Sequence, residues 1–417
     1  MEARRIPLSP EDRAILDLES PRVAGHTCKV IVLAEGRPGL GALREEITAR
    51  LDAAPELLRR LDGPADAPTW RQDRGIDPSA HIVSANQTAP LDQARLREMV
   101  GELFAQRLDR SRPLWRIDLV SLSQGGSALV WRIHHALADG TTAMRLAHAV
   151  LFEAGIESGG PPAKPEAAHA AEDDARRRHH LAGLLRREFA RGRSPSPFDA
   201  RIGARREIEF ARLPLRPLHD GVKRLAGATV NDAVLACVAG GLRHWIELHH
   251  GDLGDMRVKV PVSLHHQGDA VGNRDSFFAV SLPIGQSDPL ERLRQIHAET
   301  AVRKDKHDAA ELDELARELG RVAPRMERLA TRLERSPRRF ALNVSNVPGP
   351  RQRMTILGEA VSSLHTLAEI GERHALRVAA LSYADELCLG LCADPDVVHD
   401  LGDLARAIEA EAQNFLG

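Results

Sequence analysis

Aromatic side chains are scarce in this chain of 417 residues, which contains nine Phe, four Trp and one Tyr. Its core must therefore be built mainly from Ala, Leu and Val, which suit an aliphatic ligand better than a planar one. Charge of one sign is also lacking, because 57 Lys and Arg oppose 59 Asp and Glu, for a net charge of −2. This balance excludes the overall basic surface of nucleic-acid-binding proteins.

Cysteines and long apolar runs are few as well. Neither zinc-ligand spacing nor a disulfide framework is visible in the four cysteines, Cys28, Cys237, Cys388 and Cys392. The opening stretch MEARRIPLSPEDRAIL has no apolar signal-peptide core, and no apolar run approaches the roughly 20 residues that cross a bilayer. We therefore expect a cytoplasmic protein without a metal site.

Apolar patterns divide the chain into two halves that each mix strands and helices. In the first half they predict strands at 28–36, 115–122 and 127–137, a helix at 91–108 and a helix after Gly140. In the second half they predict helices at 231–248, 288–303, 309–334 and 396–413, and strands at 257–264, 277–284, 340–347 and, as a pair, within 377–394. The length exceeds that of one typical core, so we expect an α/β (α+β) protein with domains at 1–156 and 207–417.

Residues 157–206 differ from both halves and begin with a charged stretch rich in Pro, Gly and Ala, which is typical of a linker. Within them, 176–193 is rich in Arg and His and has an apolar helical face formed by Leu181, Leu184, Leu185 and Phe189. A basic amphipathic helix can lie on an anionic membrane surface. Composition alone favours a solvated interdomain helix, and peripheral contact with a membrane or lipid droplet is the second interpretation.

The segment WRIHHALADG, residues 131–140, carries the clearest chemical pattern. A regular strand would turn His134 and His135 to opposite faces, and Asp139-Gly140 is typical of a turn leading into a helix. An imidazole with a pKa near 6.5 suits removal of a proton from an alcohol that attacks a thioester. The alternatives are an incidental His-His pair, of which the chain has others, and a metal site, for which the sequence offers no third ligand.

The pattern H-H-x-x-x-D-G is that of the CoA-dependent acyltransferase superfamily, and other segments resemble the bacterial wax ester synthase/diacylglycerol acyltransferase family. They follow the family's order: LSPEDRAILDLESP at 8–21, LDRSRPLWRIDLV at 108–120, ATVNDAVLACVAGGLR at 228–243, PVSLHHQGDAVGNRDSFFAVSLP at 261–283, FALNVSNVPGP at 340–350 and SYADELCLGLCAD at 382–394. Each alone has a plain structural interpretation, such as a Pro-fixed strand start or a helix cap. Six in order are far more specific than one.

The resemblance implies two chloramphenicol-acetyltransferase-like domains, with mixed sheets flanked by helices and a tunnel at their interface. It implies an O-acyltransferase that moves a fatty acyl group from acyl-CoA to a hydrophobic alcohol, either a long-chain alcohol or diacylglycerol, with no tightly bound cofactor. By resemblance, His135 is the general base and His134 is structural. Asp139, followed by Gly140, anchors the loop by pairing with an arginine.

The resemblance also nominates substrate-binding positions within the matched motifs, namely Pro113, Leu114, Trp115, Asn231, Asp232, Asn273, Arg274, Ser345 and Asn346. Of these, Asn231 and Ser345 are candidate donors to the oxyanion that forms during transfer. The family commonly has an arginine where this chain has His265, so Arg274 is our candidate partner of Asp139.

Two other functions stay open. One is an acyltransferase of the same fold with another acceptor, such as a sugar, polyketide or amine, or with a carrier-protein donor. The other is a catalytically silent protein that binds acyl-CoA or lipid.

Overall fold

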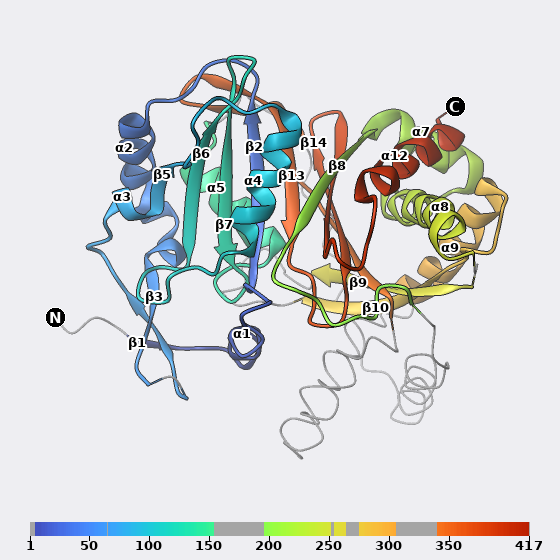
Figure 1. The fold of residues 1–417 in the computed structure, drawn as a ribbon, viewed down its shortest axis with the longest axis horizontal. Coiled ribbons are helices and arrows are strands. Elements are labelled where there is room, and N and C mark those ends of the chain that lie inside the picture. The colour runs from blue at the N-terminus through green and yellow to red at the C-terminus, as the bar shows by residue number, and fades with distance from the viewer. Residues whose placement is uncertain are drawn as a thin grey trace.

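The computed structural model describes residues 5–64, 66–153, 196–251, 254–263, 275–305 and 340–416. These residues form two halves that lie side by side, each built around a sheet (Figure 1). The expected helix at 309–334 and the basic segment 176–193 lie outside the described residues.

The first half of the chain contributes seven strands and five α-helices to the described structure. The strands are β1 (Arg5–Pro7), β2 (His26–Leu33), β3 (Arg59–Asp62), β4 (Thr69–Gln72), β5 (Ile82–Ser84), β6 (Trp115–Ser121) and β7 (Ser127–His134). The helices are α1 (Pro10–Leu16), α2 (Leu40–Arg50), α3 (Pro78–His81), α4 (Gln93–Ala105) and α5 (Gly140–Val150).

The second half contributes eight strands and four α-helices to the described structure. The strands are β8 (Glu207–Pro214), β9 (Met256–Ser263), β10 (Asp275–Leu282), β11 (Leu342–Val347), β12 (Thr355–Ile356), β13 (Glu359–Ala368), β14 (Leu376–Tyr383) and β15 (Glu386–Ala393). The helices are α7 (Leu215–Ala226), α8 (Val230–His249), α9 (Pro289–Asp305) and α12 (Leu401–Ala412).

Two six-stranded sheets organise these elements and confirm the expected mixed α/β architecture. The first has the order β12-β13-β2-β7-β6-β5, and the second has the order β10-β9-β11-β14-β15-β8. A smaller sheet, β1-β4-β3, accompanies the first. Both large sheets mix parallel and antiparallel pairs, because β5 runs parallel to β6 while β6 runs antiparallel to β7, and β11 runs parallel to β14 while β14 runs antiparallel to β15.

The second half of the chain also completes the first sheet. Strand β13 pairs antiparallel with β2, with Thr366 opposite Lys29, and β13 also packs against β14 and β15 of the second sheet. Residues 355–368 lie within the expected second domain, yet they form β12 and β13 of the first sheet. Strand β13 is therefore the seam between the two halves (Figure 1).

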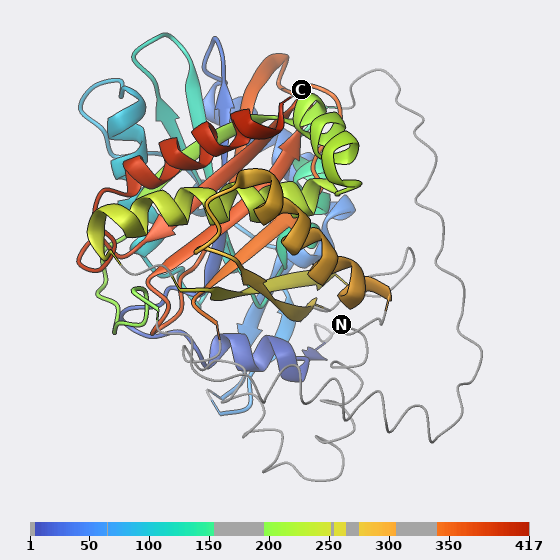
Figure 2. The same cartoon turned by 90° about the vertical axis from the view of Figure 1, so that its right-hand side faces the viewer.

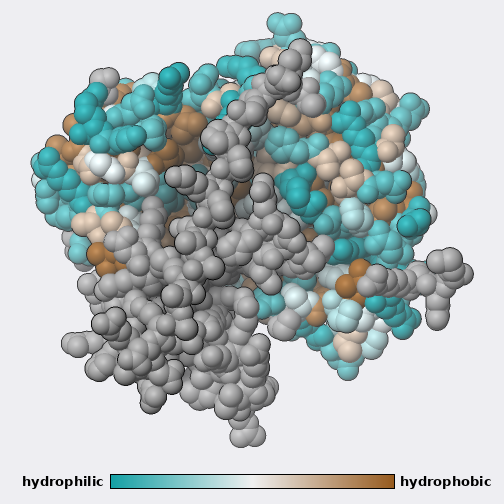
Figure 3. Space-filling model, turned by 180° about the vertical axis from the view of Figure 1, so that it is seen from behind, coloured by the Kyte–Doolittle hydropathy of each residue, from teal (hydrophilic) through white to brown (hydrophobic). Residues whose placement is uncertain are grey.

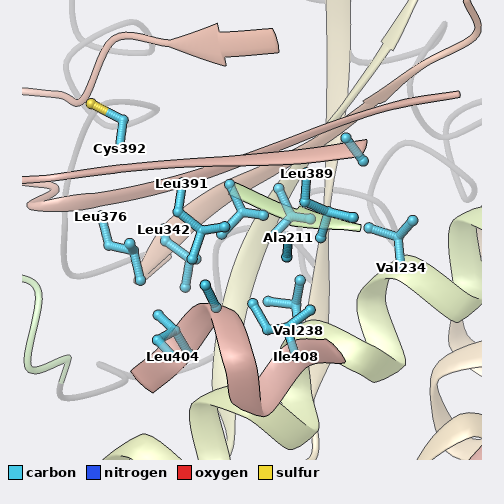
Figure 4. Close-up of a cluster of buried hydrophobic side chains, with 14 of the residues drawn as sticks. Ala211, Val234, Val238, Leu342, Leu376, Leu389, Leu391, Cys392, Leu404 and Ile408 are labelled. Carbon is cyan, nitrogen blue, oxygen red and sulfur yellow. The ribbon is translucent and has the colours of Figure 1, made fainter. Parts of the chain in front are cut away.

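The cores follow from the alternation of side chains along the strands. In the second half, helices α8, α9 and α12 cover one face of the sheet (Figure 2). Between sheet and helices, Val238, Leu389 and Ile408 meet in a wholly buried cluster (Figure 4). This core continues to α4 and to one face of the first sheet, where it includes Val130. The next residue, Trp131, faces a separate core under α2 and α5, as the strand period predicts.

Among the described residues, no single helix is long and apolar enough to cross a membrane. The pair α7 and α8, bent by 92°, passes that test by length and composition, although most residues of α8 are buried in the core. Seen from behind, the described surface is widely hydrophilic, with smaller hydrophobic areas between (Figure 3).

Candidate active site

The two predicted histidines lie where β7 ends and the chain turns toward α5. His134 is the last residue of β7, and His135 begins the turn. Asp139 caps α5 and is fully buried, and its carboxylate accepts the N–H of Thr142 at 2.6 Å. Gly140 starts the helix, and a β-carbon there would lie 3.1 Å from Cγ2 of Val347 at the end of β11. The motif therefore lies against the strand that carries Ser345 and Asn346.

His134 is fully buried, and its contacts are with the protein itself. The ring nitrogen Nδ1 of His134 accepts the main-chain N–H of Ala136 at 3.1 Å. The main-chain N–H of His134 donates to the carbonyl of Leu114 at 2.9 Å. Burial lowers the pKa of His134 to about 3, with smaller contributions from the charges of His135 and Arg110. The imidazole of His134 is therefore neutral at physiological pH.

His135 is less buried than His134, and its N–H donates to the carbonyl of Gly25 at 2.9 Å. Burial and the guanidinium of Arg377 lower the pKa of His135. The carboxylate of Asp139 and a hydrogen bond with the residue's own backbone oppose this effect, while Lys29 adds to it. The net lowering keeps the imidazole neutral near pH 7, which is the form that a general base requires.

Lys29 affects the pKa of His135, and the motifs did not indicate it. It lies on β2 with a side chain only 1% exposed, and its Nζ donates to Oγ1 of Thr366 on β13 at 2.7 Å. Burial lowers the pKa of Lys29 to about 8, against the opposing influence of Cys28 and Asp139. The available signal was a lysine inside the apolar run CKVIVL. Arg377, on β14, lies in a similar apolar run, ALRVAAL.

The predicted substrate positions fall into separate groups. Pro113, Leu114 and Trp115 are buried, and Nε1 of Trp115 donates to the carbonyl of Leu57 at 2.8 Å. Leu114 supports His134 through its carbonyl, so this segment braces the site. Beside it lies a cavity of about 440 Å³ whose lining includes Arg107, Arg112, Arg116 and Arg132. Guanidinium groups are suited to phosphate or carboxylate ligands.

Asn231 and Asp232 lie in the first turn of α8. Asp232 is fully buried and forms a capping box with Thr229. Its carboxylate also accepts from Nδ1 of His297 at 2.9 Å and from Oγ1 of Thr300 at 2.6 Å, both on α9. These contacts connect two helices, and Asn231 beside them is partly exposed.

Ser345 and Asn346, on β11, are both partly exposed. Asn273, Arg274 and His265 lie outside the described residues, so the proposed pairing of Arg274 with Asp139 stays a prediction. The predicted tunnel between the domains likewise stays a prediction. Among the described residues, no group of three or more His, Cys, Asp or Glu side chains could hold a metal ion.

Comparison with solved structures defines the class of fold. A wax ester synthase/diacylglycerol acyltransferase from Marinobacter aquaeolei VT8 superposes with a TM-score of 0.73 and 23% identity, covering 98% of each chain. The starter condensation domain of rhizomide synthetase, in a variant complexed with C8-CoA and Leu-SNAC, superposes with a TM-score of 0.62 and 16% identity, covering 99% of this chain and 95% of that one. The fold is therefore that of the two-domain, chloramphenicol-acetyltransferase-like proteins.

Sequence comparison identifies the family within this class. Residues 8–190 match the wax ester synthase/diacylglycerol acyltransferase catalytic domain, and residues 271–414 match the WS/DGAT C-terminal domain. A putative diacylglycerol O-acyltransferase of Mycobacterium tuberculosis is 30% identical, covering 97% of this chain and 94% of its own length. A probable diacylglycerol O-acyltransferase of the same species is 31% identical, with coverages of 82% and 80%. The chain belongs to the wax ester synthase/diacylglycerol acyltransferase family and is an acyltransferase.

Proposed function

We propose that this enzyme transfers a fatty acyl group from acyl-CoA to the hydroxyl of a long-chain alcohol or diacylglycerol, with His135 as the general base. The observation that carries the proposal is the placement of His135, which follows β7 with its main chain fixed to Gly25 and its pKa lowered by burial and Arg377. A neutral, fixed imidazole of this kind can accept a proton from an alcohol.

The reaction needs no covalent enzyme intermediate. The imidazole of His135 takes the hydroxyl proton as the alcohol oxygen attacks the thioester carbonyl, so a C–O bond forms and an oxyanion develops. Collapse of the oxyanion breaks the C–S bond, and the departing thiolate takes the proton from the imidazolium, giving the ester and free CoA. Burial raises the pKa of Cys28 to about 12 and of Cys388 to about 11, which disfavours a thiolate nucleophile at either position.

Several groups are suited to assist the transfer. Ser345 and Asn231 remain our candidate donors to the oxyanion, and Ser345 shares β11 with Val347, which contacts the catalytic turn. Arg107, in the lining of the cavity beside Trp115, is a candidate contact for the CoA phosphates. The other three arginines of the lining are paired with Asp109 or Asp118. The structural neighbour complexed with C8-CoA supports acyl-CoA as the donor.

Membership of the family supports the proposed acceptor. Long-chain alcohols, diacylglycerol and their esters partition into lipid, so we also propose that the basic segment 176–193 brings the enzyme to a membrane or lipid-droplet surface. Deleting 176–193 should then abolish sedimentation with anionic liposomes, and unchanged sedimentation would contradict this part of the proposal.

The decisive experiment measures release of CoA thiol with acyl-CoAs of varied chain length and a panel of acceptors. With a long-chain alcohol or diacylglycerol, His135→Ala should lower kcat by about 10²- to 10⁴-fold. The matched control is His219→Ala, which removes a half-exposed histidine of α7 and should leave kcat unchanged.

Each contrary result points to a different conclusion. Equal turnover by His135→Ala would refute general-base catalysis. Turnover with only a sugar, an amine or a carrier-protein thioester would refute the proposed acceptor or donor. Binding of acyl-CoA without turnover of any acceptor would show a binding protein.

A further inference from the structure

Glu19 is a buried carboxyl group beside the site that the mechanism above does not use. It lies in the segment between α1 and β2, with a side chain only 2% exposed. Oε2 pairs with the guanidinium of Arg110, and Oε1 lies 3.9 Å from Nε2 of His134. Within the described residues, neither Oε1 of Glu19 nor Nε2 of His134 has a hydrogen-bond partner, and both atoms are buried.

The tautomer of His134 follows from its other nitrogen. Because Nδ1 accepts the N–H of Ala136, Nδ1 carries no proton. Since the ring is neutral at physiological pH, its single proton is on Nε2, which faces Oε1 of Glu19. A donor thus faces an acceptor, and the negative charge of a carboxylate favours this tautomer over the reverse one.

His134 in turn organises the chain that follows His135. Its carbonyl accepts the N–H groups of Leu137, at 2.9 Å, and Ala138, at 3.2 Å, while Nδ1 accepts that of Ala136. Three consecutive N–H groups after His135 therefore donate to His134. A rotation of the His134 ring, or a change of its tautomer, removes the hydrogen bond from Ala136 to Nδ1. The turn that presents His135 is then less well held.

The segment that carries Glu19 also contacts both histidines through Gly25. Its carbonyl accepts the N–H of His135, and a β-carbon on Gly25 would lie 2.7 Å from Nε2 of His134. Gly25 has φ of 74°, a left-handed conformation that favours glycine. Because Gly25 has no side chain, the main chain packs directly against the His134 ring, and a larger residue would collide with Nε2.

We propose that Glu19 is a positioning residue, whose carboxylate holds the His134 ring in the Nε2–H tautomer and so fixes the turn that presents His135 to the substrate. The catalytic consequence rests on the proposed role of His135 as base. The effect on His134 itself does not depend on that role, so the two can be tested separately.

The test combines histidine ¹⁵N NMR spectra with steady-state kinetics on the full chain. In the wild type at pH 7, the His134 signal, identified by its loss in His134→Gln, should show a proton on Nε2. Glu19→Gln should shift this signal toward a mixture of tautomers. It should also lower kcat by about 100-fold, as expected for misplacement of a catalytic group, with the KM for acyl-CoA unchanged.

Asp17→Asn is the matched control, because it neutralises an exposed carboxylate two residues away and should change neither measurement. A wild-type His134 protonated on Nδ1 would overturn the proposal even if Glu19→Gln failed to fold. An unchanged His134 signal in a folded Glu19→Gln, or an altered signal with normal kcat, would overturn it too. If His135→Ala retains turnover, the general-base proposal fails, while the NMR result still decides how Glu19 acts on His134.

Discussion

The charge environment of His135 comes from side chains on three different elements. Arg377 on β14 and Lys29 on β2 lower the pKa of its imidazole, and Asp139 at the start of α5 raises it. Two fixed cations and one carboxylate thus surround a partly buried base. The protonation state of the base depends on the packing of the two halves as much as on the motif.

Lys29 gives this arrangement a measurable dependence of stability on pH. Its ammonium group has a pKa of about 8 in the folded chain and an ordinary value of 10.5 when exposed. Between these values the unfolded chain binds more protons than the folded chain, so the free energy of unfolding should rise with pH. The rise attributable to Lys29 should be about 3 kcal/mol.

Urea unfolding of wild type and Lys29→Met at pH 7 and at pH 10.5 measures this effect. The wild type should gain about 3 kcal/mol relative to Lys29→Met over this interval. Lys223→Met, which removes an exposed lysine of α7, should follow the wild type at both pH values. Equal pH dependence of wild type and Lys29→Met would contradict the prediction.

The motif residues that are neighbours in the sequence also lie together in the structure. His134, His135, Asp139 and Gly140 fall within one strand, turn and helix start, so their spacing determines their geometry. Glu19 and Arg377 come from distant segments. The pairing of β2 with β7 brings the segment of Glu19 to the histidines, and the packing of the two sheets brings Arg377. Local pattern contains no information on such pairings, and a charged residue is ordinarily exposed.

At the scale of elements, Asp232 joins α8 to α9. Burial alone raises the pKa of its carboxyl, but hydrogen bonds from Thr300, Thr229 and His297 outweigh burial and lower it. The side chain of Asp232 is therefore ionised in the folded chain, where it accepts these hydrogen bonds. The contribution of these bonds to stability is present above the carboxyl's unfolded pKa, near 4, and is lost as pH falls through the lower folded pKa.

Asp232→Ala should accordingly lower the free energy of unfolding at pH 7 by about 2 kcal/mol, because the buried hydroxyl of Thr300 loses its acceptor. The difference from wild type should shrink as pH falls below about 4. Urea unfolding at pH 7 and pH 3 measures both effects, with Asp220→Ala, an exposed carboxylate of α7, as the control. If Asp232→Ala lowers the free energy of unfolding at pH 7 no more than Asp220→Ala does, Asp232 does not stabilise the contact between α8 and α9.

Elements with strong periodicity were predicted well, but the elements that pack or pair with them were not. The expected helices at 91–108 and 231–248 correspond to α4 and α8, and the expected strand at 127–137 corresponds to β7. The threonine and aspartate at 229 and 232 have the spacing of a helix cap, but nothing local indicates that α9 supplies further donors. Strand β13 was not predicted, since EAVSSLHTLA mixes polar and apolar residues on both of its faces.

At the scale of the whole molecule, Glu369 at the end of β13 fastens three segments together. Its carboxylate accepts from Nε of Arg206 at 2.8 Å and from the N–H groups of Ala24, at 3.0 Å, and Ile370, at 3.1 Å. Arg206 also donates to the carbonyl of Arg22. The chain before β2, the chain before β8 and the end of β13 thus meet at one buried ion pair.

Arg206→Gln should lower the free energy of unfolding by about 3 to 5 kcal/mol, because it leaves the buried carboxylate of Glu369 without its cation. Arg205→Gln is a matched control at the adjacent position, where the arginine is 69% exposed and pairs with Asp396. That exposed pair should contribute less than about 1 kcal/mol. Chemical denaturation of both variants makes the comparison, and similar losses in the two would refute the fastening role of Glu369.

The pairing of β2 with β13 also constrains the order of events during synthesis. Strand β2 emerges from the ribosome early and gains β7 on one side, but its other side lacks a partner until residue 359 has been made. Until then β2, which is an interior strand of the finished sheet, is an exposed edge strand. Exposed edge strands favour aggregation of nascent chains. The amine of Lys29, which is buried in the folded chain, lies on that strand and remains hydrated until β13 pairs with it. Burial of Lys29 lowers the stability of the folded enzyme at neutral pH, but on the exposed edge of β2 the same lysine disfavours aggregation of the nascent chain.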